Sequence, residues 1–403
     1  MTQITSSGSR GSRMAAVAVS AMLVLAACSG SGDASHKAAP KDESFYVAPQ
    51  DLSDYSAGDL IWSRDYEGPN AIDGAENSLV LYAQEAHDGA GLVGVSGIVS
   101  VPKGEAPVGG WPVISWGHGS TGMADRCAPS WDKVKPDNDF VNEQFVGEWI
   151  GKGYAVVRSD YEGLGTPGDH PYLIGPSAGR SVLGIVAAAR ELDSDLSNNV
   201  VLVGHSQGGH AALWGASMAE SARDLNVQGV VAFAPPSHLA GALEAVIGGM
   251  ANAPSGMIAV VLRGLEIGHP DDVDPSTVLL PAGLAKYPKI DDACFGELFE
   301  PELFGSLPVA EFGNQEADMT LVKGKLNAND PAFRTINVPV LVAQGSQDMT
   351  VPSIMTNFLA EEFEKKGFDF VYLTYPKADH NSVLVESRDS ANQFIDKAFN
   401  GSK

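Results

Sequence analysis

Short apolar runs alternate with longer periodic segments along most of the chain. The apolar runs are rich in β-branched residues and predict eight strands, at residues 79–85, 92–101, 112–116, 154–158, 200–203, 229–233, 338–343 and 368–375. Between and after the later runs, helical patterns occupy residues 179–192, 208–222, 354–366 and 389–399. Such alternation is typical of a mainly parallel sheet with helices on both faces, so the pattern predicts an α/β fold.

The alternation is interrupted between Pro235 and Thr335. Roughly a hundred residues there separate two strands that one helix of ordinary length would connect. We therefore expect a mainly helical cap at residues 236–335, inserted into a core made of residues 51–235 and 336–403. A set of cap residues either lines an acyl pocket or forms the core of a small helical subdomain: Met250, Met257, Ile258, Val260, Val261 and Leu262.

The N-terminal segment is organised differently. Arg10 and Arg13 precede an uncharged apolar run at residues 14–27, which is typical of an export signal. Leu-Ala-Ala-Cys at residues 25–28 resembles a bacterial lipobox, and that resemblance implies cleavage before Cys28, acylation of Cys28 and retention at the outer face of the cell membrane. The alternative is an ordinary signal peptide and release of the protein outside the cell. Residues 28–50 predict a flexible tether.

The charge of the chain limits which binding partners are expected, and its cysteine content predicts a disulfide. The 403 residues are 44% hydrophobic, enough for a sizeable core, and 26 basic against 50 acidic residues give a net charge of -24. This balance opposes binding to nucleic acid and to anionic membrane surfaces, so a membrane contact would depend on the lipid at Cys28. If Cys28 is acylated, only Cys127 and Cys294 remain, and export predicts that they form a disulfide. Two buried free thiols are the alternative.

A serine nucleophile is indicated by Gly-His-Ser-Gln-Gly at residues 204–208. This G-x-S-x-G follows an apolar strand and precedes a helix, which is the context in which the motif forms a sharp turn that exposes the serine. Ser206 is therefore the predicted nucleophile. Its neighbours His205 and His210 are interpreted as structural.

A serine hydroxyl needs a base, and the base needs a carboxylate that orients it. Asp348 lies just after the strand at residues 338–343, and His380 lies just after the strand that ends at Tyr375. Because both follow strand ends, we predict a Ser206, His380, Asp348 triad. Asp379 adjoins the histidine but is expected to point elsewhere.

The oxyanion of an acyl-transfer intermediate requires two backbone donors. The N–H of Gln207, directly after the nucleophile, is the first predicted donor. The second is expected in the glycine-rich loop after the strand at residues 112–116, from the N–H of Ser120 or, alternatively, of Gly119.

Three motifs together resemble the secretory lipase family of α/β-hydrolases: WGHGSTGMADRC at residues 116–127, SDYEGLGTP at 159–167 and GHSQGG at 204–209. The resemblance implies an α/β-hydrolase fold with a helical cap, and a secreted triacylglycerol lipase or esterase. It places Asp160 and Tyr161 after the fourth strand, where they are expected to brace the active-site loops.

The predicted function is hydrolysis of carboxylic esters through an acyl-enzyme on Ser206. Transfer to an envelope-lipid acceptor or peptide hydrolysis by the same triad stays open, as does a non-catalytic lipoprotein that binds a lipid or protein partner. No cofactor or metal is expected, because the chain lacks H-E-x-x-H, metal-spaced His and Cys, and a dinucleotide-binding glycine motif. The sequence gives no prediction of oligomeric state.

Overall fold

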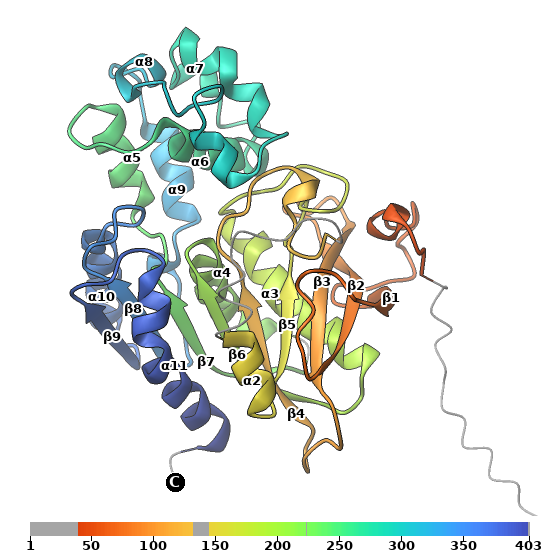
Figure 1. Ribbon diagram of the computed structural model, residues 1–403. Coiled ribbons are helices and arrows are strands. Elements are labelled where there is room, and N and C mark those ends of the chain that lie inside the picture. Colours follow the sequence, from red (N-terminus) through yellow and green to blue (C-terminus); the bar gives the residue numbers. More distant parts are fainter. Residues whose placement is uncertain (1–38, 132–144, 223, 402–403) are drawn as a thin grey trace, which may run out of the picture. The chain divides into compact units, whose positions relative to one another are not determined.

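Within the described residues, the eight predicted strands and one further strand, β1, form one sheet of nine strands in the order β1-β2-β3-β5-β4-β6-β7-β8-β9 (Figure 1). The computed structural model describes residues 39–131, 145–222 and 224–401. The strands are β1 (Leu60–Asp65), β2 (Ala75–Glu85), β3 (Leu92–Pro102), β4 (Trp111–Gly117), β5 (Ala155–Ser159), β6 (Leu196–His205), β7 (Asn226–Phe233), β8 (Val340–Gly345) and β9 (Phe370–Tyr375). Along this order, the first three pairs, β1 with β2, β2 with β3 and β3 with β5, are antiparallel. All the following pairs, from β5 with β4 to β8 with β9, are parallel.

Helices cover both faces of the sheet. The sheet-covering helices are α2 (Gly147–Gly151), α3 (Gly175–Leu192), α4 (Gln207–Ser217), α10 (Ser353–Lys366) and α11 (Ser382–Asn400). One hydrophobic cluster joins α3, α4 and α10 to one face, and another joins α2 and α11 to the other. The α/β class and the parallel centre are therefore as predicted, since the central strands contain the apolar runs expected of strands buried on both faces.

The number of strands was predicted wrongly as eight, because β1 gives a weak signal. Its sequence, LIWSRD, is buried over the first three residues and becomes exposed toward Asp65. β1 pairs with β2 alone, at the edge of the sheet. A short edge strand has neither the continuous apolar run of a central strand nor a clean alternation, so its sequence resembles that of a loop.

The prediction of a flexible tether over residues 28–50 is wrong at its C-terminal end. Glu43–Tyr46 forms a short 3-10 helix, η1, in which Phe45 and Tyr46 are buried. The Trp62 indole N–H donates to the Phe45 carbonyl at 2.9 Å, and the Tyr46 hydroxyl donates to the Ser130 carbonyl at 2.8 Å. These aromatic residues find their partners far along the chain, which the polar local composition did not indicate. The export signal and Cys28 lie outside the described residues.

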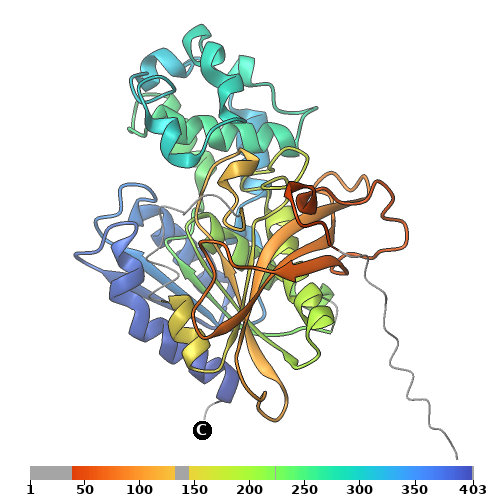
Figure 2. The same ribbon diagram turned by 45° about the vertical axis from the view of Figure 1, so that its right-hand side comes forward.

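Five α-helices occupy the chain between β7 and β8: α5 (Leu239–Ile247), α6 (Ser255–Gly268), α7 (Pro281–Lys286), α8 (Val309–Phe312) and α9 (Thr320–Ala328). We call these helices and the segments that connect them the cap. Figures 1 and 2 show the cap stacked at one end of the sheet. The cap has a hydrophobic cluster of its own, which also includes Met123 and Tyr172 from loops of the core. In the part of the chain that the structure describes, no helix is long and apolar enough to cross a membrane.

Several 3-10 helices complete the fold. Besides η1 they are η2 (Asp125–Cys127), η4 (Ala219–Ser221), η5 (Pro275–Thr277), η6 (Tyr287–Ile290), η7 (Phe295–Phe299) and η8 (Pro331–Phe333).

A disulfide between Cys127 and Cys294 joins the cap to the loop that follows β4, as the cysteine count predicted. Around it, the Phe295 N–H donates to the Thr121 carbonyl at 2.8 Å and the Met123 N–H donates to the Ala293 carbonyl at 3.0 Å. The cap is therefore attached to this loop by a covalent bond and by short backbone pairing.

We expect a Cys127→Ser, Cys294→Ser double variant to unfold at a lower urea concentration than the oxidised protein. The bridge closes a sequence separation of 167 residues. Loop-closure entropy assigns it about 5 kcal/mol of unfolding free energy, and removal of native bridges costs roughly 2–5 kcal/mol. Equilibrium urea unfolding of both proteins measures the difference, and equal unfolding midpoints would show that the bridge adds no stability.

Candidate active site

Ser206 occupies a strained turn between β6, which ends at His205, and α4, which begins at Gln207. Its backbone angles are φ 53° and ψ -120°, a region that residues with a side chain seldom adopt. The flanking residues Gly204 and Gly208 allow the backbone segments around this turn to approach closely. A Cβ at position 208 would lie 1.9 Å from the Gly117 carbonyl oxygen, and a Cβ at position 204 would lie 2.1 Å from the carbonyl oxygen of Gly208. The motif therefore forms the close turn that its spacing predicted.

Asp348 and His380 come together across the loops that follow β8 and β9. His380 Nδ1 lies 2.7 Å from Asp348 Oδ2, and the Asp348 carboxylate is buried. Its other hydrogen bonds come from the N–H groups of Thr350 and Val351, both at 2.8 Å, and from Gln344 Nε2 at 3.0 Å. Burial raises the pKa of Asp348, but the hydrogen bond from His380 and these further donors outweigh burial and bring the pKa below its ordinary value. Asp348 is thus an ionised acceptor that orients the imidazole.

The rival residues have other partners. Asp379 accepts hydrogen bonds from the Ser382 N–H at 2.8 Å and from the Ser382 hydroxyl at 2.6 Å, at the start of α11. His205 Nε2 lies 2.8 Å from the His380 carbonyl, and burial together with the nearby His380 lowers the pKa of His205 to about 3. His210 Nε2 contacts the Asn329 carbonyl at 2.8 Å. Burial also lowers the pKa of His210 to about 4, so both histidines are neutral near pH 7 and donate hydrogen bonds to these carbonyls.

Ser206 and His380 line one cavity of about 810 Å³ between the core and the cap. Its walls are largely apolar, as expected of a ligand site. From the cap they include Leu239, Ala242, Leu243, Val246, Met257, Ile258 and Val261, and from the segment that follows Asp348 they include Met349, Ile354, Met355 and Phe358. Of the cap residues proposed for an acyl pocket, Met257, Ile258 and Val261 thus line the cavity. Val260 and Leu262 are fully buried in the cap, and Met250 is exposed.

Three backbone N–H groups near the nucleophile in the sequence or in the fold have no protein acceptor among the described residues. Within the described ranges, the N–H groups of Gly119, Ser120 and Gln207 make no hydrogen bond to the protein. A Cβ at position 119 would lie 3.7 Å from the Ser206 Cβ, so this loop passes directly beside the nucleophile. They are the same three groups for which an oxyanion-binding role was predicted from the sequence, and that role stays a prediction. Unpaired donors fixed beside a nucleophile are suited to bind an oxyanion.

Gln207 is held by a residue that the sequence analysis did not single out. Its side-chain nitrogen lies 3.0 Å from His170 Nε2, and His170 Nδ1 lies 2.7 Å from the Glu162 carbonyl. Burial lowers the pKa of His170 to about 4, so the ring is neutral near pH 7. A carbonyl can only accept, so the proton belongs on Nδ1 and Nε2 accepts from Gln207. No motif marked His170, because its loop meets α4 only in the folded chain.

Asp160 and Tyr161 brace the surrounding loops. Asp160 accepts hydrogen bonds from the Ser96 hydroxyl at 2.6 Å and from the N–H of Ser130 at 2.9 Å. The Tyr161 hydroxyl donates to the His118 carbonyl at 3.0 Å. Tyr161 thereby supports the loop that carries Gly119, in agreement with the bracing role that the resemblance implied.

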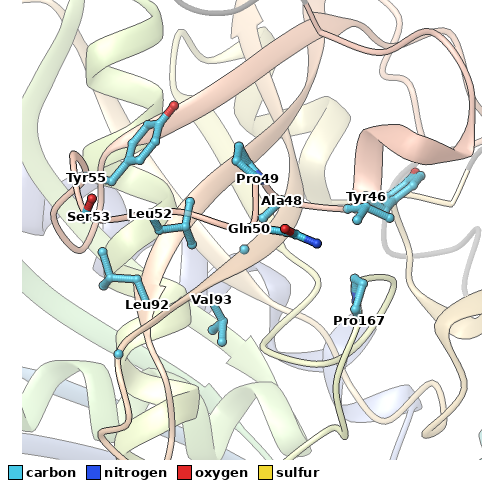
Figure 3. A pocket seen from close by; sticks show the side chains of 13 residues that line it. Tyr46, Ala48, Pro49, Gln50, Leu52, Ser53, Tyr55, Leu92, Val93 and Pro167 are labelled. Atoms are coloured by element: carbon cyan, nitrogen blue, oxygen red, sulfur yellow. The ribbon is translucent and has the colours of Figure 1, made fainter.

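A second cavity, of about 520 Å³, lies elsewhere on the core (Figure 3). Residues 46–50, 52–53, 55 and 91–94 and Pro167 line it. None of these is a histidine, carboxylate or cysteine, so they offer no base for nucleophilic catalysis. Among the described residues, no group of three or more His, Cys, Asp or Glu is placed to hold a metal ion.

Comparison with known proteins supports the resemblance and the fold. The model of the secretory lipase family matches residues 140–274. Lipase A of Moesziomyces aphidis is 24% identical over 392 residues, covering 90% of this chain and 80% of that protein. The crystal structure of Candida antarctica lipase A has a TM-score of 0.74 at 22% identity, covering 89% of this chain and 86% of that one. The rice cell wall degrading esterase LipA of Xanthomonas oryzae has a TM-score of 0.69 at 20% identity, covering 87% and 100%. The predicted resemblance and the α/β-hydrolase fold are confirmed.

Proposed function

We propose that this chain, which has the α/β-hydrolase fold and resembles the secretory lipases, hydrolyses carboxylic esters through an acyl-enzyme on Ser206. The observation that supports this most directly is the 2.7 Å contact between His380 Nδ1 and a buried, ionised Asp348, with His380 and Ser206 lining the same cavity. That arrangement supplies a nucleophile, a base and the carboxylate that orients the base.

The reaction begins when Ser206 Oγ attacks the ester carbonyl and His380 Nε2 takes the hydroxyl proton. Asp348 holds the imidazole in the tautomer with its proton on Nδ1 and stabilises the imidazolium that forms. The N–H of Gln207 and that of Ser120 or Gly119 bind the oxyanion. Collapse of the intermediate returns the proton to the leaving alcohol and leaves the acyl group on Ser206. Water, activated by His380, then releases the carboxylic acid and restores the serine.

The cavity supports an ester with an extended apolar acyl group, as in a triacylglycerol. Its cap-side wall includes aliphatic side chains from α5 and α6, among them Val246, Ile258 and Val261. Burial of each methylene of an acyl chain against such a wall contributes about 0.8 kcal/mol. Activity on p-nitrophenyl esters from acetyl to palmitoyl tests this proposal, and an optimum at acetyl would favour a short-chain esterase.

We expect Ala242→Trp to reduce kcat/KM for long acyl chains far more than for acetyl. Ala242 is half-buried and lines the cavity. An indole at this position would fill part of the cavity that we assign to the far end of a long acyl chain. The ratio of palmitoyl to acetyl kcat/KM should fall by about tenfold or more, the equivalent of at least two lost methylene contacts. The matched control is Ala282→Trp, on an exposed cap position outside the cavity lining. Equal losses for both chain lengths would contradict the acyl assignment.

We also propose that the protein is exported and held at the outer face of the cell membrane by acylation of Cys28. Support comes from the charged and apolar pattern of residues 1–27, the lipobox-like residues 25–28 and the secretory character of the matching family. Metabolic labelling with a fatty-acid analogue should mark the wild-type protein and not Cys28→Ala. A soluble, unlabelled wild-type protein would instead support ordinary secretion.

A further inference from the structure

In the proposed mechanism, only backbone N–H groups bind the oxyanion, and the side-chain hydroxyl of Ser120 has no role. Its Oγ lies 2.6 Å from the phenolic oxygen of Tyr172, and both residues line the cavity that contains Ser206. Neither hydroxyl makes another hydrogen bond within the described part of the chain. Each hydroxyl carries one proton, and only one of the two protons is used in the hydrogen bond between them. The other proton has no acceptor among the described residues of the protein.

The chemistry of the two groups decides where this proton lies. Burial raises the pKa of Tyr172 to about 12, partly offset by its hydrogen bond with Ser120, so the phenol is neutral and keeps its O–H near pH 7. A phenol is still a stronger acid, and hence a better donor, than an alkyl alcohol. Tyr172 therefore donates to Ser120, and the Ser120 hydroxyl keeps its own proton for an acceptor in the cavity.

We propose that the Ser120 hydroxyl is a side-chain donor to the oxyanion, in addition to the backbone N–H groups, and that Tyr172 is the positioning residue that orients it. This inference rests on the proposed ester hydrolysis. Gly119 lies beside Ser206, with its hypothetical Cβ 3.7 Å from the Ser206 Cβ, so the next residue is placed to reach the oxygen that becomes negative. A donor fixed before the reaction stabilises that charge without reorganisation.

Tyr172 is itself fixed by the core and by the cap. Its N–H donates to the His170 carbonyl at 2.8 Å, and its side chain belongs to the hydrophobic cluster of the cap. Helix α6 packs so closely here that a Cβ at Gly264 would lie 2.1 Å from the Tyr172 carbonyl oxygen. The loop at residues 170–172 thus contacts both sides of the oxyanion site, through His170 at Gln207 and through Tyr172 at Ser120. A loop with contacts to both the core and the cap suits an orienting role.

Kinetics of hydroxyl-deleting variants test the proposal, because Ser120→Ala and Tyr172→Phe leave the backbone donors in place. We expect Ser120→Ala to lower kcat by about 10²-fold, the size of one lost oxyanion donor, and Tyr172→Phe to lower it by about tenfold, both with little change in KM. The double variant should match Ser120→Ala, since Tyr172 acts only through Ser120. Ser120→Thr, which restores a hydroxyl, should recover most of the loss.

The matched control is Tyr154→Phe, which removes a phenol that hydrogen-bonds to Asp396 at 2.7 Å outside the cavity lining. It should retain wild-type kcat. Thermal unfolding identifies any variant that loses structure, and the rate of phosphonate inactivation should fall in parallel with kcat, because the phosphonyl oxygen occupies the oxyanion position. Wild-type kcat in Tyr172→Phe, or losses that multiply in the double variant, would overturn the proposal. Absence of ester hydrolysis in the wild-type protein would instead refute the proposed function.

Discussion

Ser206→Ala is expected to lower kcat for p-nitrophenyl esters by at least about a thousandfold. The substitution removes the oxygen that forms the acyl-enzyme, and the methyl side chain that remains leaves the oxyanion donors and the apolar cavity intact. Residual turnover then comes from binding and oxyanion stabilisation alone. KM should change little, because the acyl wall of the cavity is untouched.

A matched serine control is available on α4, the helix that begins directly after Ser206. Ser217 lies at the end of α4, where its hydroxyl donates to the Trp214 carbonyl at 2.7 Å, and it is outside the cavity lining. Ser217→Ala should keep wild-type activity. If Ser206→Ala and the wild-type protein hydrolyse the esters at the same rate, the observed hydrolysis does not use the predicted nucleophile.

The second large effect is expected for Asp348→Asn, which should lower kcat by about 10³–10⁴-fold while the protein stays folded. Asp348 accepts hydrogen bonds from two backbone N–H groups, from Gln344 and from His380. An asparagine must place its NH₂ toward one of these donors. If it faces His380, the imidazole moves its proton to Nε2 and can no longer take a proton from Ser206. Steady-state kinetics of both proteins on the same p-nitrophenyl ester and at the same pH measure the loss.

Asp379→Asn is the matched control for that variant. Asp379 adjoins His380 in the sequence, and its carboxylate caps the first turn of α11 through Ser382. Asparagine is also a good N-terminal cap, so the helix should persist and kcat should stay close to wild type. A large loss in Asp379→Asn together with normal activity in Asp348→Asn would reverse the assignment of the acid.

Much of the sheet could be predicted because its central strands are buried on both faces. The later parts of β6 and β7, at residues 200–203 and 230–233, are continuous runs of valine and other apolar residues, as expected of strands buried on both faces. β1 and η1 were missed for the opposite reason. Phe45 and Tyr46 sit in a polar segment, and their burial depends on Trp62 and Ser130, which are close only after folding.

In the site, too, the features with a local sequence signal could be predicted, and those that depend on contacts between distant segments could not. The nucleophile is marked by local spacing, since the turn requires glycines at positions 204 and 208, and the positions of Asp348 and His380 follow from parallel topology. The contacts of His170 and Tyr172 with the oxyanion loops have no local signal, because they join α4 and the loop after β4 to a segment before α3. In α6, helical periodicity could have separated the cavity residues from the core residues: Met257, Ile258 and Val261 recur at the spacing of one helix face.

The most direct measurement of the nucleophile is covalent trapping with a p-nitrophenyl alkylphosphonate, followed by peptide mass spectrometry. Attack by Ser206 displaces p-nitrophenol and leaves a stable phosphonyl ester on the serine. The triad predicts one modified peptide, carrying the added mass on Ser206, in the wild-type protein and none in Ser206→Ala. An unmodified wild-type protein that still hydrolyses esters, or a phosphonyl group on another residue, would contradict Ser206 as the catalytic nucleophile.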